Sequence, residues 1–200
     1  MDILAIFVSA IFVNNILLSQ FLGNCPYLGC SREKGVAVGM GAAVIFVTVV
    51  ATLFTWLMQH YVLDPLKLGY LQTIVFIVVI AALVQFVEMF LKKMVPPLYR
   101  SLGIYLPLIT TNCAVMGVAL LMQRKGYDLV TSLLYAAGYS SGFLLALLLM
   151  AGIRERLDTC RLPKTMAGTP IALVMAGLMS LAFMAFKGMA PRITCIGALL

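Results

Sequence analysis

The chain has 200 residues, of which 63% are hydrophobic and 10% are charged, and its mean hydropathy is +1.08. Soluble domains usually carry about 25% charged residues, so this composition excludes a water-soluble globular protein. The formal net charge is +7. We interpret it as loop charge beside anionic lipid and expect no nucleic-acid partner, because the sequence has neither a nucleic-acid motif nor a basic stripe interleaved with aromatic residues.

Charged residues divide the chain into six uncharged windows. Each is about as long as, or longer than, the roughly 20 apolar residues that a helix needs to cross a bilayer. In chain order they are 3–31, 35–59, 68–87, 101–123, 129–153 and 165–186. The sequence therefore predicts an all-α integral membrane protein with six transmembrane helices in the lipid bilayer.

Lys and Arg residues are distributed unevenly between the loops. Nine follow the first, third and fifth windows, and five lie on the opposite side or in the C-terminal segment. Because positively charged loops tend to stay in the cytoplasm, we expect a multi-pass protein with both termini on the outer side.

One short motif, Asn-Cys-x-x-x-Gly, occurs twice, at 24–29 and 112–117. Each copy lies in the first window of a group of three, and 88 residues separate Cys25 from Cys113. A polar pair at membrane depth is costly unless it is partnered, so the duplication predicts a paired functional site.

The position of the motif divides the chain into two halves of three crossings each. We predict a first repeat at 1–95, a second at 96–188 and a C-terminal tail at 189–200. An odd number of crossings makes the second half enter the membrane from the opposite side. The prediction is two inverted three-helix repeats, with a working site near the midplane where they meet.

The first helix of each repeat is predicted to be broken near the midplane. The window 3–31 is too long for one straight crossing and contains Asn14, Asn15, Gly23, Pro26 and Gly29. The window 101–123 contains Pro107 and Gly117 around its cysteine. Proline removes a helical N–H and glycine loosens the backbone, although both also occur in unbroken transmembrane helices.

A buried cysteine is most often a small core residue, but packing alone gives no reason for Asn-Cys in both halves. A disulfide between Cys25 and Cys113 is one alternative. Metal ligation is the other, and it gives a role to the polar neighbours Asn24, Thr111 and Asn112, because thiolate ligands need hydrogen bonds. Iron–sulfur clusters usually take four thiolates, so two ligands would come from another protein chain.

The chain resembles the A subunits of Rnf ion-translocating electron transport complexes and the related E subunits of sodium-pumping NADH:quinone reductases. The resemblance runs from the first window to about residue 188 and is most specific over 102–121. Shorter matching segments are 13–15, 21–26, 85–89, 153–157 and 176–182.

The resemblance implies that Cys25 and Cys113 bind a 2Fe-2S cluster together with two cysteines of the complex's homologous E subunit, which is inserted the other way up. Electrons would pass between cytoplasmic iron–sulfur and flavin subunits and flavins near the outer face, coupled to Na⁺ or H⁺ movement. The implied location is the bacterial inner membrane, with both termini periplasmic. No role follows for Cys30, Cys160 or Cys195.

Glu88 is the acidic residue placed within a predicted span. It can form a helical ion pair with Lys92, four residues later. Alternatively, Glu88 and Gln85, one turn earlier, could lie on a cation path.

Two other functions remain open from the sequence. An inverted-repeat secondary transporter without a redox centre would also need broken helices. A structural membrane anchor would need only the apolar spans.

Overall fold

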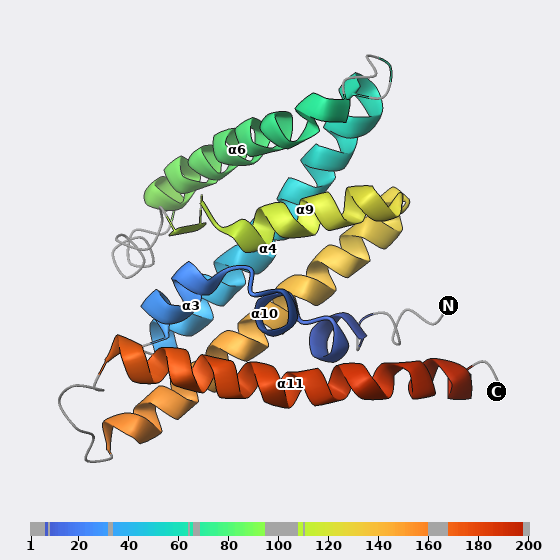
Figure 1. Ribbon diagram of the computed structural model, residues 1–200. Coiled ribbons are helices and arrows are strands. Elements are labelled where there is room, and N and C mark those ends of the chain that lie inside the picture. The colour runs from blue at the N-terminus through green and yellow to red at the C-terminus, as the bar shows by residue number, and fades with distance from the viewer. Residues whose placement is uncertain are drawn as a thin grey trace.

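The computed structural model describes residues 9–31, 34–63, 69–94, 111–159 and 168–197, together with Phe7, Pro65, Leu108 and Ile109. Within these residues every regular element is a helix, as the sequence predicts (Figure 1). The elements are η1 (Ser9–Val13), α2 (Ile16–Gln20), α3 (Asn24–Cys30), α4 (Lys34–Met58), η2 (Gln59–Leu63), η3 (Gly69–Leu71), α6 (Gln72–Met94), α9 (Cys113–Lys125), α10 (Leu129–Asp158) and α11 (Thr169–Gly197).

Several helices have the length and composition of membrane spans. Among the described residues, the stretches Lys34–Leu63, Gly69–Met89 and Leu129–Asp158 are long and apolar enough to cross a bilayer. Thr169–Ala185 is a shorter apolar stretch of α11. The first two match the predicted windows 35–59 and 68–87, and the third contains the window 129–153.

The first window is interrupted at two places. A π-helical turn, η1, ends at Val13, and α2 begins after Asn15. α2 then ends at Phe21, which has the left-handed φ of 55°, and α3 begins after Gly23, whose φ is 88°. Pro26 lies in the first turn of α3, where proline is tolerated, so it does not cause either interruption.

Asn15 stabilises the first interruption by bridging two segments. Its side chain is fully buried, and Oδ1 accepts hydrogen bonds from the N–H groups of Leu17 and Leu18 at 3.1 and 3.3 Å. Its Nδ2 donates to the carbonyls of Ile11 at 3.2 Å and Gly142 at 2.8 Å. All of these groups would otherwise be costly to bury in an apolar protein.

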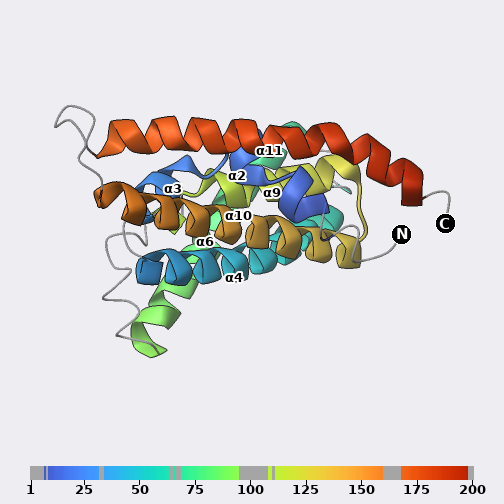
Figure 2. The same cartoon turned by 90° about the horizontal axis from the view of Figure 1, so that it is seen from below.

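α4 and α10 run side by side through the centre of the molecule (Figure 1), with α11 on the other side of α10 in Figure 2. Gly41 of α4 lies directly against the Leu144 side chain of α10, which allows close packing. α9 packs against α4 and α6, whereas η1 and α2 pack against α10 and α11. The helices formed by each motif-bearing window, η1 and α2 in the first repeat and α9 in the second, therefore pack on two long helices of the other predicted repeat.

Four helices, α6, α9, α10 and α11, extend beyond the C-terminal ends of their predicted windows. α10 continues to Asp158, and Glu155 in its added turn pairs with Lys34 at the start of α4. α11 continues to Gly197, through most of the segment expected to be a tail.

Candidate functional site

The two copies of the motif meet in space. The backbone N–H of Gly23, two residues before Cys25, donates a hydrogen bond to the Sγ atom of Cys113 at 2.9 Å. Cys25 and Cys113 are both exposed at the surface of the isolated chain. The Cys113 thiol therefore lies against the turn at Gly23 that leads into the helix carrying Cys25.

Gly23 allows this close approach because it has no side chain. Its φ of 88° is left-handed, a conformation that other residues rarely adopt. A Cβ at this position would lie 2.8 Å from Cε2 of Phe143 and 3.1 Å from Cβ of Ala114. It would also lie 3.2 Å from Oδ1 of Asn112, so the turn is enclosed by the second copy of the motif and α10.

Each cysteine lies at the beginning of a helix. Cys25 is the second residue of α3, and Cys113 is the first residue of α9. The N-terminal N–H groups of a helix the length of α9 carry partial positive charge, which favours a negatively charged ligand such as a metal-bound thiolate at Cys113.

The three predicted polar neighbours are adjacent to the cysteines in the sequence. Asn24 is the half-buried first residue of α3, and Thr111 is exposed. Asn112 is buried and caps α9, with its Oδ1 accepting from the N–H of Ala114 at 3.0 Å. Among the described residues, its Nδ2 atom has no hydrogen-bond partner. A buried amide donor beside Cys113 is therefore left for a group from outside this part of the chain.

The donor set fits half of a thiolate-ligated cluster. Two exposed thiols and one N–H···S hydrogen bond match the surroundings that iron–sulfur ligands require. Across the described residues, no group of three or more His, Cys, Asp or Glu side chains could hold a metal ion. A complete cluster would need ligands beyond these two cysteines.

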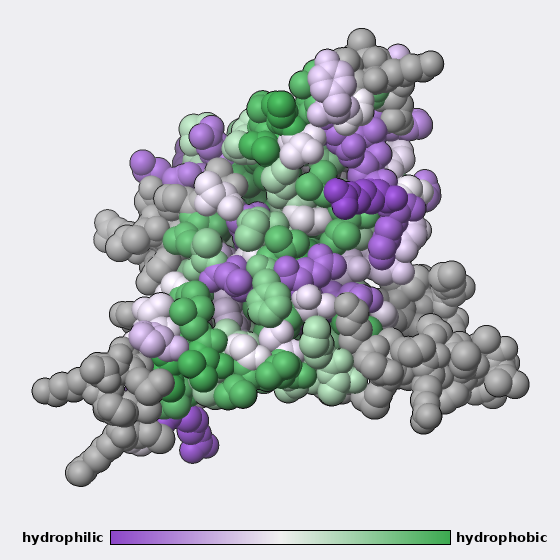
Figure 3. Space-filling view, viewed as in Figure 1, coloured by the Kyte–Doolittle hydropathy of each residue, from purple (hydrophilic) through white to green (hydrophobic). Residues whose placement is uncertain are grey.

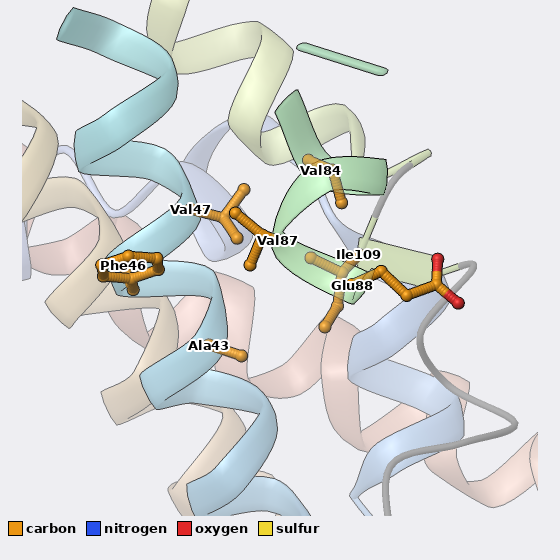
Figure 4. Close-up of a pocket in the computed structure, with 7 residues that line it drawn as sticks. All are labelled: Ala43, Phe46, Val47, Val84, Val87, Glu88 and Ile109. Atoms are coloured by element: carbon orange, nitrogen blue, oxygen red, sulfur yellow. The ribbon is translucent and has the colours of Figure 1, made fainter. Parts of the chain in front are cut away.

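The predicted cation path residues lie elsewhere. Glu88 is half-buried at the edge of a cavity of about 30 Å³, lined otherwise by the apolar residues Ala43, Phe46, Val47, Val84, Val87 and Ile109. Its carboxylate points away from the α4 side chains (Figure 4). Gln85 is exposed one turn away. The cavity holds about one water molecule and offers few polar ligands, so the role of Glu88 and Gln85 in ion movement stays a prediction.

Of the other three cysteines, only the Cys30 side chain is described. Cys30 is buried at the end of α3. Cys160 lies outside the described residues, and for Cys195 only the helical backbone of α11 is described.

Arg154 is a structural residue of the site that the sequence did not single out. It is 8% exposed and donates from one guanidinium nitrogen to the Leu28 carbonyl and to Oγ of Ser31, both at 2.8 Å. These bonds join the end of α3 to α10. Since Arg154 directly follows the window 129–153, the sequence marked it only as a charge of a cytoplasmic loop.

The surface of this region is mixed in polarity. In Figure 3, hydrophilic residues gather near the middle of the face, around the segment that joins α2 to α3, with hydrophobic residues on either side. A polar region at this place agrees with a site that another molecule completes.

Comparison with known proteins gives a consistent result. The family described as "Rnf-Nqr subunit, membrane protein" matches residues 3–190. A relative from Acetobacterium woodii, named as the A subunit of a Na⁺-translocating ferredoxin:NAD⁺ oxidoreductase complex, is 56% identical over 189 residues. That match covers 94% of this chain and 98% of the relative.

Two further relatives are named as A subunits of ion-translocating oxidoreductase complexes. The protein from Syntrophotalea carbinolica is 56% identical, over 95% of this chain and 98% of its own length. The protein from Cereibacter sphaeroides is 50% identical, over 96% of this chain and 99% of its own length. With the family match spanning nearly the whole sequence, this chain belongs to the Rnf-Nqr family of membrane subunits.

Proposed function

We propose that this chain is the A subunit of an ion-translocating ferredoxin:NAD⁺ oxidoreductase complex. In that complex it would provide Cys25 and Cys113 as two ligands of a 2Fe-2S cluster within the membrane. The names of its relatives support the complex, because they describe A subunits that match the chain over almost its full length. The chain is then a non-autonomous part of an oxidoreductase that moves Na⁺ or H⁺.

The hydrogen bond from Gly23 to Cys113 carries this proposal. It joins the turn just before the first motif copy to the cysteine of the second copy, 90 residues later in the sequence, and both cysteines are exposed. Simple core packing of the cysteines would instead bury the thiols, as happens at Cys30. A disulfide within the chain would not supply a hydrogen-bond acceptor for Asn112 Nδ2, whereas a cluster shared with a partner protein would give that donor an acceptor.

When bound, the cluster would accept and release an electron within the bilayer and so divide a gap of about 30 Å into two shorter transfers. The residues of this chain hold one side of the site. Gly23 donates to the Cys113 sulfur, Asn112 fixes the start of α9, and Arg154 fixes the end of α3. The two remaining thiolates would come from the homologous E subunit, which has inverted topology, and flavins and further iron–sulfur clusters from other subunits.

The first segment of each predicted repeat packs on helices of the other repeat, and this packing supports two inverted three-helix repeats. A twofold relation in the membrane plane would match α4 with α10 and α6 with α11. It would also match the segment η1–α3 with α9. The contacts agree, because α9 packs on α4 and α6 whereas η1 and α2 pack on α10 and α11. In this arrangement the protein lies in the bacterial inner membrane with both termini on the periplasmic side.

Replacement of the cysteines in the purified complex tests the proposal. We expect Cys25→Ser and Cys113→Ser each to abolish the visible absorbance and the electron-spin signal of one 2Fe-2S cluster, and to lower the iron and sulfide content by one cluster. Cys30→Ala is the matched control, because Cys30 is a buried cysteine of the same short helix as Cys25. Full retention of iron, sulfide and both spectra in the two serine variants would refute the ligand assignment.

A further inference from the structure

Two adjoining cavities lie at the C-terminal end of α9, away from the cysteine site. The outer one has a volume of about 330 Å³ and is lined by Trp56, Gln59, His60, Gln123, Gly126, Tyr127 and Asp128. The inner one has about 10 Å³ and is lined by Thr52, Thr55, Trp56, Ala119, Met122, Gln123 and Ser132. Because Trp56 and Gln123 border both, the wide polar cavity leads to a small inner one. A volume of about 10 Å³ is at the lower limit of what one water molecule or one small ion needs.

The inner cavity has oxygen ligands whose hydrogens are already engaged. Thr52 Oγ1 donates to the Thr48 carbonyl at 2.8 Å, and Thr55 Oγ1 donates to the Ala51 carbonyl at 2.8 Å. Ser132 Oγ donates to the Tyr127 carbonyl at 3.3 Å. All three side chains are almost fully buried. A hydroxyl that has given its single proton away can only accept, so these oxygens offer lone pairs to a cation or a water hydrogen.

The charges around the outer cavity are of both signs. Asp128 is exposed at its border, and His60 stacks on Trp56 with ring centroids 5.3 Å apart. Arg124 and Lys125 are exposed at the end of α9, and the Lys125 ammonium lies over the rings of Tyr127 and Tyr135 at 5.5 and 5.6 Å. In Figure 3, hydrophilic residues cluster over the corner where α9 meets α10.

The type of ligand selects the ion. Among the described residues that line the inner cavity there is no Asp, Glu or His, so these residues include no group that takes up a proton near neutral pH. Divalent ions such as Mg²⁺ and Ca²⁺ are usually held by carboxylates, which the inner cavity also lacks. Neutral hydroxyl and amide oxygens suit a hard monovalent cation. In addition, the C-terminal end of a helix carries partial negative charge, which favours a cation near Gln123.

We propose that Thr52, Thr55, Ser132 and Gln123 form a Na⁺ site, reached through the outer cavity bordered by Asp128 and His60. The inference rests on the proposed function and specifies the ion and its place of entry. α9 then links the two sites. Its N-terminus holds Cys113 and its C-terminal half borders the cation, so each end carries the charge that the helix dipole favours.

Sodium uptake by the intact complex in liposomes tests the site. Ferredoxin-driven uptake of ²²Na⁺ is measured against Na⁺ concentration, giving KM and kcat. We expect Thr52→Val, Thr55→Val and Ser132→Ala each to raise the KM for Na⁺ about tenfold, with a smaller effect on kcat, because each removes one oxygen ligand. Asp128→Asn, an exposed change with little effect on packing, should raise KM less and mainly at low ionic strength.

Matched controls separate ligation from packing. Thr48 and Ser140 are also almost fully buried and donate to carbonyls one turn earlier at 2.6 and 2.7 Å, but border neither cavity. Thr48→Val and Ser140→Ala should keep the wild-type KM. Three results would each overturn the site: an unchanged KM for Na⁺ in the three site variants, an equal rise of KM in the two controls, or no ferredoxin-driven uptake of ²²Na⁺ by the wild-type complex. The cysteine ligands are judged separately, by the cluster spectra of Cys25→Ser and Cys113→Ser.

Discussion

Gly23 and the two asparagines Asn15 and Asn112 determine how the chain bends at the cysteine site. Asn15 and Asn112 each cap the helix that follows, through Oδ1 and backbone N–H groups. Gly23 supplies the left-handed turn between α2 and α3 and the N–H that reaches Cys113. Two asparagine caps and one glycine turn therefore stabilise irregular backbone inside an apolar protein.

Replacement of Gly23 tests this arrangement at the residue scale. Gly23→Ala adds a Cβ 2.8 Å from Phe143 in a left-handed conformation. We expect a loss of about 2–4 kcal/mol of stability, from backbone strain and crowding together, and loss of the cluster signal. Thermal unfolding and spin resonance of the purified complex measure the two effects.

Gly168→Ala is the control for backbone strain alone. Gly168 has a similar φ of 100°, but a Cβ there meets no atom of the described residues within 4 Å. It should cost only about 1–2 kcal/mol and leave the cluster signal intact. Equal behaviour of the two variants would argue against the close contact at Gly23.

Part of the site can be read from single residues. The repeated Asn-Cys-x-x-x-Gly motif draws attention to the cysteines, and its second asparagine, Asn112, caps the helix that begins at Cys113. The donor to Cys113, however, is Gly23, which lies just before the first motif copy, and its neighbour Phe143 is 120 residues further on. Such contacts depend on tertiary packing, which no local pattern contains.

At the scale of elements, α3 is the helix that most depends on its neighbours. It has seven residues, too few to be stable in isolation. Arg154 of α10 binds its C-terminal end, and Tyr27 donates to the sulfur of Met179 in α11 at 3.4 Å. The position of Cys25 is thus fixed by contacts with α10 and α11.

Removal of Arg154 should loosen α3. In Arg154→Met, the Leu28 carbonyl and Ser31 hydroxyl lose their donor, and we expect a cost of about 1–3 kcal/mol. Amide hydrogen exchange in α3 should become faster. Arg156→Met is the control, because it removes one positive charge from an exposed position two residues away. Any effect of the lost loop charge on membrane orientation is therefore the same in both variants. If exchange in α3 is the same in both variants, Arg154 does not hold this helix.

Helix boundaries show what charge and composition can predict. The window 35–59 differs from α4 by one residue at each end, because no charged residue interrupts that helix after Lys34. α10 extends past its window because Arg154 and Glu155 are satisfied by Ser31, the Leu28 carbonyl and Lys34. A rule that ends a span at the first charge cannot detect charges that are partnered by other helices.

At the scale of the whole molecule, α9 connects two sites of opposite charge preference. Cys113 at its N-terminus lies on the exposed surface, and the polar cavities border its C-terminal half. Reduction of a cluster near Cys113 would add negative charge at one end of this helix. A cation bound at the other end, about 18 Å away along the 13-residue helix, would be attracted by that charge through protein of low dielectric constant. This gives a direct physical route by which electron transfer can favour ion binding.

A density map of the intact complex, with iron located by its anomalous scattering, tests the shared cluster most directly. We predict that the sulfur atoms of Cys25 and Cys113 bind one two-iron cluster together with two cysteine sulfurs of a second, homologous protein. Sulfur atoms that lie far apart, or that face lipid with no iron between the two proteins, would contradict this prediction.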